Sequence, residues 1–194
     1  NALRRAGSGP RAWNFHPQRT TGRTEAAFLQ NVLADAAQKF NLDKSRVLLS
    51  GFSIGGSMAS YIACNNPDFA TAYAPVGGSF WRPHPTRCTA PVRLFHTHGW
   101  ADGTVPLEGR RVGPGFVQGD VFHALSIWRQ TNLCDQPRAR KFSKTGQFMR
   151  RKWTECTPNS ALEFALFPGG HVVPQGWARM ALDWFEQQLP NPAN

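Results

Sequence analysis

Hydrophobic and polar residues alternate along the chain in two patterns, one typical of helices and one of strands. Apolar positions spaced three to four residues apart predict amphipathic helices, and short unbroken apolar runs predict buried strands. The first helix is expected from Thr24, a favourable N-cap residue, to Phe40. The further elements are expected in the order strand 47–49, helix 58–63, strand 70–76, strand 92–96, helix 120–131, strand 162–167 and helix 176–189.

This alternation of strands and helices predicts an α/β fold. Right-handed strand–helix–strand units place the strands in a mainly parallel sheet with helices on both faces. Residues 1–23 show neither period and are expected to form a loop, and the prolines of 79–91 argue against a regular element there. The basic stretch 137–151 is expected to be a surface excursion or a hairpin. We therefore expect a single domain over residues 1–194.

One segment combines the strand pattern with residues suited to chemistry. The strand 47–49 runs into Gly51-x-Ser53-x-Gly55, and a helix follows. A strand that turns sharply into a helix places its turn residue in a strained backbone conformation, and small residues two positions away leave room for the turn. Ser53 is expected at the tip of this turn with its hydroxyl exposed. The alternative is a glycine-rich turn without chemistry.

Two further polar residues follow predicted strands and complete a hydrolytic set with Ser53. Asp102 comes after strand 92–96, and His171 comes after strand 162–167. The carboxyl ends of parallel strands meet at one edge of the sheet, where sites in such folds lie. A serine hydroxyl becomes nucleophilic when an imidazole takes its proton, and a carboxylate orients that imidazole. The order Ser, Asp, His is that of α/β-hydrolases. The rival acids Asp120 and Asp135 follow no strand.

The remaining site predictions concern the oxyanion and the substrate. The amide of Ile54, directly after the nucleophile, is one expected oxyanion donor, and a second donor is not recognisable. Trp100 is placed to line an acyl or aromatic pocket and Trp13 to line the rim, with a packing role as the alternative for both. His96 and His98 lie two apart on one strand, but no carboxylate or cysteine is placed to complete a metal site. We expect these histidines to be structural or supporting, and no metal or other cofactor.

Composition and charge limit the classes of partner. The 194 residues are 41% hydrophobic and 18% charged, which is typical of a folded protein with a sizeable core. No apolar run approaches the length of a membrane span, so no membrane partner is expected. The net charge of +10 could attract an anionic polymer or nucleic acid. Because no nucleic-acid-binding motif accompanies the charge, a solvated basic surface is the simpler interpretation.

Four cysteines allow three disulfide pairings if all are oxidised. Pairing Cys64 with Cys88 and Cys134 with Cys156 would close two loops of similar length, each joining a helix C-terminus to the segment before the next strand. Such bonds favour an oxidising compartment. Four buried free thiols in a reducing compartment are the alternative.

Taken together, the motifs resemble the secreted polyhydroxybutyrate depolymerase and feruloyl esterase group of α/β-hydrolases, over about residues 11–189. The resemblance implies a secreted or periplasmic carboxylesterase that acts on a polyester or on ester substituents of plant polysaccharide. It implies Ser53 as nucleophile, Asp102 as acid, His171 as base and the Ile54 amide in the oxyanion hole, with the two disulfides paired as above. The segments that carry it are Gly51-Phe52-Ser53-Ile54-Gly55-Gly56, Ala63-Cys64, Ala74-Pro75-Val76-Gly77-Gly78, His98-Gly99-x-x-Asp102-x-x-Val105-Pro106 and Gly169-Gly170-His171.

The chain departs from this group at its N-terminal end. Members have further strands before the helix that starts at Thr24, including a loop that supplies the second oxyanion donor, and residues 1–23 do not resemble them. We therefore expect a sheet that lacks the N-terminal strands, in a piece of a longer protein; the alternative is that the loop around Trp13 and Asn14 replaces the second donor. Two other functions stay open: a truncated or inactive hydrolase domain that binds polymer, and a basic module that binds anionic polymer. A peptidase or acyltransferase would use the same three residues.

Overall fold

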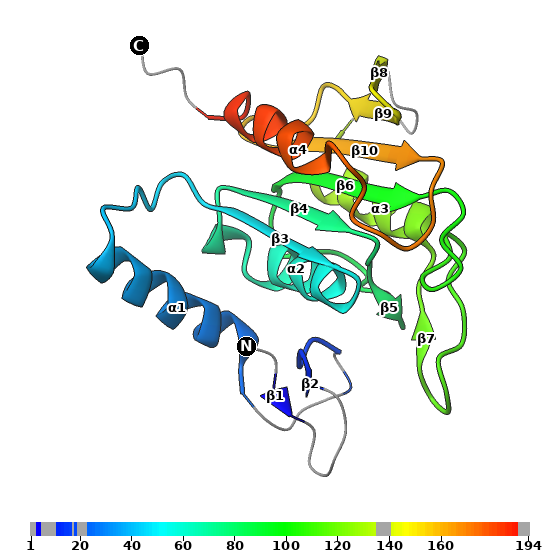
Figure 1. Cartoon of the computed structure of the whole chain (residues 1–194), viewed down its shortest axis with the longest axis horizontal. Helices are drawn as coiled ribbons and strands as arrows, with labels where there is room; N and C mark the ends of the chain where they lie inside the picture. Colours follow the sequence, from blue (N-terminus) through cyan, green and yellow to red (C-terminus); the bar gives the residue numbers. More distant parts are fainter. Residues whose placement is uncertain (1–2, 5–10, 17, 19–22, 135–140, 190–194) are drawn as a thin grey trace.

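The computed structural model describes residues 3–4, 11–16, 18, 23–134 and 141–189. A six-stranded sheet forms its centre (Figure 1). Four neighbouring strands of this sheet are parallel, and two antiparallel strands extend it at one edge. In spatial order the strands are β3 (Leu48–Phe52), β4 (Ala72–Val76), β6 (Arg93–Gly99), β10 (Ala161–Phe167), β9 (Phe148–Trp153) and β8 (Lys141–Thr145).

Among the described residues, four helices accompany the sheet. The four helices are α1 (Glu25–Lys39), α2 (Ile54–Asn65), α3 (Val121–Thr131) and α4 (Trp177–Glu186), with a 3-10 turn, η1 (Pro67–Phe69), after α2. Of these, α1 precedes the first strand of the sheet, α2 and α3 lie in connections between its strands, and α4 follows its last strand. The short strands form two antiparallel pairs, β1 (Leu3–Arg4) with β2 (Arg11–Ala12) and β5 (Trp81–Arg82) with β7 (Val117–Gln118).

Helices cover both faces of the sheet because the strands alternate their side chains between two cores. Leu94 and Leu162 point to the face that α2 and α3 cover. Phe95, next to Leu94 in β6, lies in the core under α4, where its ring stacks on Trp184. The expectation of a mainly parallel sheet between helices is confirmed.

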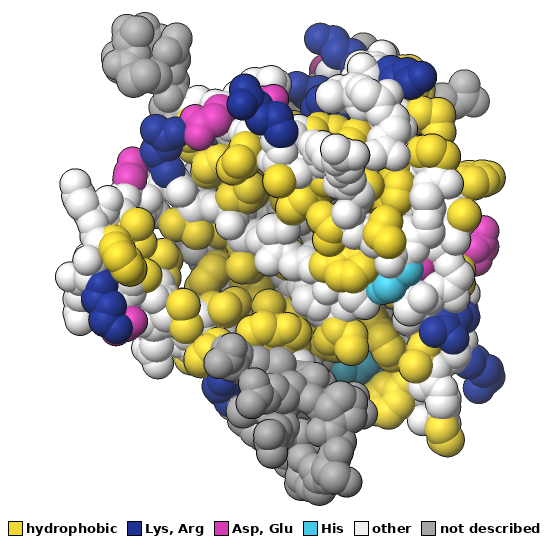
Figure 2. Space-filling model, viewed as in Figure 1, with side chains coloured by type: hydrophobic (Ala, Val, Ile, Leu, Met, Phe, Trp, Pro, Cys, Tyr) yellow, Lys and Arg dark blue, Asp and Glu magenta, His cyan; other side chains and the backbone are white. Residues whose placement is uncertain are grey.

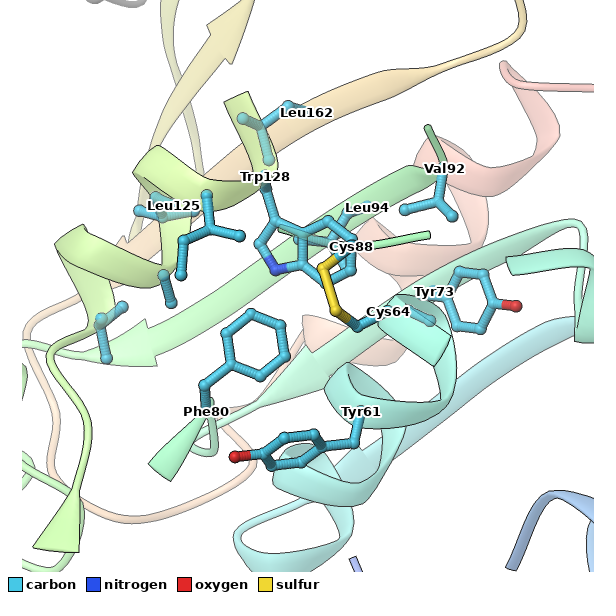
Figure 3. Close-up of a cluster of buried hydrophobic side chains, with 14 of the residues drawn as sticks. Tyr61, Cys64, Tyr73, Phe80, Cys88, Val92, Leu94, Leu125, Trp128 and Leu162 are labelled. Atoms are coloured by element: carbon cyan, nitrogen blue, oxygen red, sulfur yellow. A yellow bond between two sulfur atoms is a disulfide. The ribbon is translucent and has the colours of Figure 1, made fainter. Parts of the chain in front are cut away.

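The larger core lies between the sheet and the helices α2 and α3, as Figure 3 shows. Trp128 of α3 is 2% exposed, and its ring stacks on Phe80 with centroids 5.5 Å apart. The Cys64–Cys88 disulfide is part of the same cluster. The second disulfide joins Cys134, just after α3, to Cys156, between β9 and β10. These are the neighbouring pairs that the loop lengths favoured.

The first helix differs from the others in how little of its apolar stripe is covered. It begins at Glu25, directly after Thr24, as expected, but only Glu25 and Ala26 are buried in it. Val32 is 48% exposed and Phe40, just beyond the helix, is 65% exposed. Hydrophobic side chains line a hollow between α1 and the sheet (Figure 2). Among the described residues, no strand pairs with the outer edge of β3.

Several sequence expectations need correction in detail. The segment expected as a loop over 1–23 contains the β1–β2 pair, and the segment expected as irregular over 79–91 contains β5. Two-residue strands are too short to show a period, which is why the sequence did not reveal them. The hairpin expected as one possibility for 137–151 is confirmed over residues 141–151, which form β8 and part of β9 at the sheet edge, and 137–140 lie outside the described residues. Of the helices that the structure describes, none has the length and apolar character needed to cross a bilayer.

Candidate active site

The Ser53 turn joins β3, which ends at Phe52, to α2, which begins at Ile54. Ser53 has a φ of 59° and a ψ of −121°, in the left-handed half of backbone space, where non-glycine residues are uncommon. Its amide donates to the carbonyl of Val76 at 2.9 Å, and the amide of Ser57 donates to its carbonyl at 3.0 Å. These bonds fix the turn against β4 and the first turn of α2.

The turn is tight enough to require glycine at one of its two flanking positions. A Cβ atom on Gly51 would lie 2.3 Å from the carbonyl oxygen of Gly55, closer than real Cβ contacts. A Cβ atom on Gly55 would meet its nearest neighbour, Nε1 of Trp13, at 3.9 Å, an ordinary contact distance. The motif therefore depends on Gly51 for steric reasons and not on Gly55.

Asp102 lies three residues after β6 and is buried, with its side chain 1% exposed. Its Oδ1 atom accepts hydrogen bonds from the amides of Thr104 at 2.9 Å and Val105 at 2.8 Å. Its Oδ2 atom accepts from Nδ1 of His171 at 2.8 Å. One carboxylate oxygen is therefore used to hold the turn, and the other is directed at the histidine.

His171 follows β10 after the Pro168-Gly169-Gly170 turn. Because its Nδ1–H donates to Asp102, its Nε2 is the acceptor nitrogen, and it lies 2.9 Å from Oγ of Ser53. The side chain is 17% exposed. The ring of Phe52 lies against the imidazole with centroids 4.6 Å apart. The structure thus brings Ser53, Asp102 and His171 together from three strand ends.

This arrangement can take the proton from a serine hydroxyl. The neutral imidazole accepts the proton at Nε2, and the buried carboxylate stabilises the imidazolium that forms. Ile54 is the first residue of α2, so its amide has no acceptor within the helix, and the positive end of the helix dipole lies beside Ser53. A negative charge that develops on an oxygen next to Ser53 would be stabilised there.

Two buried histidines, His96 and His98, lie on β6, the strand that precedes Asp102. Nε2 of His96 is 3.0 Å from Nδ1 of His98, and Nε2 of His98 is 2.7 Å from the carbonyl oxygen of Val105. Burial lowers the pKa of His96 well below the usual value, and the neighbouring His98 lowers it further. Burial also lowers the pKa of His98, although the hydrogen bond to Val105 and the charge of Asp102 oppose this. Both rings are therefore neutral at ordinary pH.

The other residues considered in the sequence lie apart from this triad or at its margin. Asp120 caps α3 by accepting from the amide of His123, and Asp135 lies outside the described residues. Trp100 is 65% exposed on the loop between β6 and Asp102, and Trp13 packs on Phe28 of α1 with ring centroids 6.3 Å apart. Within the described ranges, no group of three or more potential metal ligands is found.

Two contacts of the site were missed in the sequence. The sequence places Phe52 in the turn before Ser53 but does not indicate that its ring packs on His171. Gly77 has a φ of 55°, and a Cβ atom there would lie 3.2 Å from the Phe52 ring and 3.5 Å from Nδ1 of His171. Gly77 directly follows the predicted strand 70–76. This position at a strand end was the feature of the sequence that could have indicated a role for Gly77 in the site.

No family model matches the chain. It is 28% identical over 127 residues, 63% of its length, to the bifunctional acetylxylan esterase/xylanase XynS20E of Neocallimastix patriciarum. It is 33% identical over 107 residues, 50% of its length, to feruloyl esterase B of Piromyces equi. These matches span 17% and 19% of the two relatives. Acetyl xylan esterase from Aspergillus awamori has a similar structure, with a TM-score of 0.67 at 16% identity, covering 93% of this chain and 75% of that one.

The comparisons confirm an α/β-hydrolase type of fold. They also confirm the resemblance to carboxylesterases, since the similar proteins are feruloyl and acetylxylan esterases and carboxylesterases. The resemblance to polyhydroxybutyrate depolymerases stays a prediction. Because the chain matches less than a fifth of the length of these two relatives, its activity is a matter for proposal.

Proposed function

We propose that this protein is a serine carboxylesterase with Ser53 as nucleophile, His171 as general base and Asp102 as the orienting acid. The observation that carries the proposal is the continuous chain of hydrogen bonds from Asp102 Oδ2 through His171 to Ser53 Oγ, with distances of 2.8 and 2.9 Å. The carboxylate is buried, while the imidazole stays partly exposed to an incoming substrate. A hydrogen-bond network for structural purposes alone has no need of a serine held in a left-handed conformation.

The reaction follows from these contacts. Oγ of Ser53 attacks the ester carbonyl carbon as Nε2 of His171 takes the hydroxyl proton. The tetrahedral intermediate collapses when the C–O bond to the alcohol breaks and His171 returns the proton to the leaving oxygen, which leaves an acyl-enzyme. Water then attacks the acyl carbon by the same proton transfers, and this step releases the acid and restores Ser53.

The oxyanion of both tetrahedral intermediates is assigned to the N-terminus of α2. The Ile54 amide supplies one hydrogen bond, and removal of such a donor typically costs a factor of about 100 to 1,000 in rate. The Trp13 indole lies beside the same turn, since its Nε1 is the nearest atom to a Cβ built on Gly55. Trp13 and the exposed Trp100 are the described tryptophans that we assign to substrate contact.

The substrate class is an ester substituent of plant polysaccharide, either feruloyl or acetyl. This assignment rests on the names of the relatives, an acetylxylan esterase and a feruloyl esterase. A polyester is the second candidate, and two exposed apolar side chains favour it over a small polar ester: Ile54, directly after Ser53, and Trp100, two residues before Asp102. We place the reaction in an oxidising compartment, secreted or periplasmic, because the two disulfides would not persist in a reducing one.

A fluorophosphonate probe tests the proposal because it labels only a serine activated by a base. We expect wild-type protein to be labelled at Ser53, as peptide mapping would show, and Ser53→Ala to remain unlabelled. Asp102→Asn should lower the labelling rate by a factor of about 10⁴, because the amide favours the wrong tautomer of His171. Ser126→Ala, which removes a hydroxyl bonded to the His123 carbonyl, is the matched control and should be labelled at the wild-type rate.

Folded wild-type protein that resists the probe would overturn the esterase proposal. The protein would then be a hydrolase domain that binds polymer without catalysis, or a basic module for anionic polymer. Binding to an anionic polysaccharide that weakens steeply with salt and is equal in wild type and Ser53→Ala would identify the basic module.

A further inference from the structure

Two buried imidazoles lie directly behind the proposed acid and take no part in the reaction described above. His96 is 2% exposed and His98 is fully buried. They are two residues apart on β6 and therefore point to the same face of the sheet, with rings stacked 3° from parallel and 5.3 Å apart. Buried polar rings are retained only where their nitrogen atoms find partners, so the partners indicate the role.

The hydrogen bonds of this pair fix both tautomers. The carbonyl of Val105 can only accept, so Nε2 of His98 carries the hydrogen in the 2.7 Å bond between them. Nδ1 of the neutral His98 ring is then an acceptor, and Nε2 of His96 must donate to it at 3.0 Å. The pair is a one-way chain of donors that runs from His96 through His98 to Val105.

Val105 connects this chain to the proposed acid. Its amide donates to Oδ1 of Asp102 at 2.8 Å while its carbonyl accepts from His98. The residue is thus held on both sides, and the turn from Asp102 to Val105 cannot rotate without breaking one of these buried bonds. Nε2 of His98 also lies 3.6 Å from Oδ2 of Asp102, the oxygen that binds His171.

We propose that His98, oriented by His96, is a positioning residue that aims Oδ2 of Asp102 at Nδ1 of His171. The inference rests on the proposed esterase function, since it assigns a role within that triad. His98 holds the carbonyl of Val105, Val105 holds Oδ1 of Asp102, and Oδ2 is left in line with His171. The role requires a neutral His98, because a second cation beside Asp102 would compete with the imidazolium of His171 for the same carboxylate.

The charges around His98 are consistent with this requirement. The titratable groups that face it are His96 on its own strand, Asp102 on the following turn and His171 from the loop after β10. Burial and the nearby His171 both lower the pKa of His98, and only Asp102 and the Val105 bond act in the other direction. The neutral ring of His98 therefore donates its single N–H hydrogen to the carbonyl of Val105. The negative charge of Asp102 then interacts with His171 without competition from a second cation.

A pair of variants separates positioning from simple packing. His98→Phe keeps the ring volume but removes the donor, whereas His98→Gln places an amide N–H near the position of Nε2. We expect His98→Phe to lower kcat, or the rate of fluorophosphonate labelling, by about 10- to 100-fold with little change in KM, as a small misplacement of a catalytic group does. His98→Gln should restore the rate to within about threefold of wild type, because it restores the bond to Val105. His123→Gln, an exchange on α3, is the control.

Proton NMR supplies a readout that does not require activity. The hydrogen shared by Asp102 and His171 should give a far-downfield resonance in wild type and His98→Gln, and a shifted or exchange-broadened one in His98→Phe. Should wild type resist the probe, the esterase proposal fails, yet this resonance still decides the inference. Should His98→Phe not fold, His96→Phe replaces it, with a smaller loss of rate expected and recovery in His96→Gln.

Three results would overturn the inference. The first is a folded His98→Phe protein with the wild-type rate and an unchanged resonance. The second is an equal loss in His98→Phe and His98→Gln, which would mean that the hydrogen bond to Val105 is not what the site requires of His98. The third is a loss confined to KM, which would place His98 in substrate binding.

Discussion

Ser53 is held in a backbone conformation that costs about 1–3 kcal/mol for a residue with a side chain. The hydrogen bonds from its amide to Val76 and from Ser57 to its carbonyl maintain that conformation. The close approach of Gly51 and Gly55 makes the turn narrow enough to point Oγ at His171. The position of the Ser53 hydroxyl therefore depends on backbone contacts whose groups do not react with the substrate.

Substitution of the two flanking glycines should have very different effects. Gly51→Ala places a methyl group 2.3 Å from a backbone oxygen that cannot move without opening the turn, so we expect loss of labelling at Ser53 and several kcal/mol of stability. Gly55→Ala meets only an ordinary contact within a helix and should be stable to within about 1 kcal/mol of wild type. Urea unfolding and fluorophosphonate labelling of both variants would measure this. Equal behaviour of the two variants would contradict the steric explanation.

The sequence singled out the three residues Ser53, Asp102 and His171, which hydrogen bonds connect in the structure, but not their surroundings. Ser53, Asp102 and His171 each follow a strand, and the meeting of parallel strand ends at one edge is a general rule that needs no coordinates. The ring contact of Phe52 with His171 and the bond from His98 to Val105 depend on side-chain directions across separate loops. The motif Gly51-x-Ser53-x-Gly55 also does not indicate that the turn requires glycine at position 51 but not at position 55.

At the scale of elements, each of the two disulfides joins the C-terminal end of a helix to the segment that precedes a strand of the central sheet. Cys64, in the last turn of α2, is joined to the segment before β6, and Cys134, after α3, to the segment before β10. The strands β6 and β10 carry Asp102 and His171 at their carboxyl ends. Each disulfide therefore anchors the amino end of a strand whose other end supplies the site.

Removal of the second disulfide should lower stability without abolishing the site. A Cys134→Ala/Cys156→Ala double variant opens a loop with a sequence separation of 22 residues, which corresponds to about 3 kcal/mol by the chain-entropy estimate. We expect a lower urea midpoint with nearly unchanged labelling of Ser53 at low temperature. Reduction of the wild type with dithiothreitol should lower the midpoint further, since it also opens Cys64–Cys88. An unchanged midpoint in the double variant would show that the bond does not constrain the unfolded chain.

Elements with a clear period were predicted, and those without one were not. The four parallel strands and the four helices follow the sequence patterns, with boundaries that shift by a few residues. The strand 47–49, for example, extends to Phe52. The two-residue strands β5 and β7 are held by pairing with each other over a long separation, which no local pattern records. The amphipathic stripe of α1 predicted the helix but not its exposure.

At the scale of the whole molecule, the two edges of the sheet differ in character. The outer strand β8 is exposed throughout and carries Lys141 and Lys144, charges that oppose pairing with another sheet. The opposite edge strand, β3, has the sequence Leu48-Leu49-Ser50-Gly51-Phe52 and no charge. The two lysines thus protect one edge of the sheet, and the opposite, uncharged edge strand leads into Ser53, the proposed nucleophile.

The buried histidine pair should make global stability depend on pH. His96 and His98 have pKa values below the ordinary 6.5 in the folded state because of burial. Below about pH 6.5 the unfolded chain therefore binds protons that the folded chain does not, and the free energy of unfolding falls as pH decreases. The slope approaches about 1.4 kcal/mol per pH unit for each histidine, and is lost again at neutral pH, where both states are deprotonated.

Urea unfolding between about pH 5 and 7.5 would measure this slope, because carboxylates titrate mostly below that range. His96→Gln removes one titrating ring while keeping an amide donor for His98, so it should show a shallower slope than wild type. A free energy of unfolding that is constant over this range in wild type would show that the rings do not resist protonation.

The residues of the proposed triad are far apart in the sequence, and this affects when they can meet during synthesis of the chain. Ser53 and His171 are 118 residues apart, and β10, which precedes His171, pairs with β6 and β9 on its two sides. During synthesis the serine leaves the ribosome long before its base, and a nascent chain that stops short of β10 has no partner for the hydroxyl. The serine proposed as nucleophile therefore meets its proposed base only after β10 has been made. The proposed reactivity would thus arise late in the synthesis of the described fold, when of its elements only α4 remains to be added.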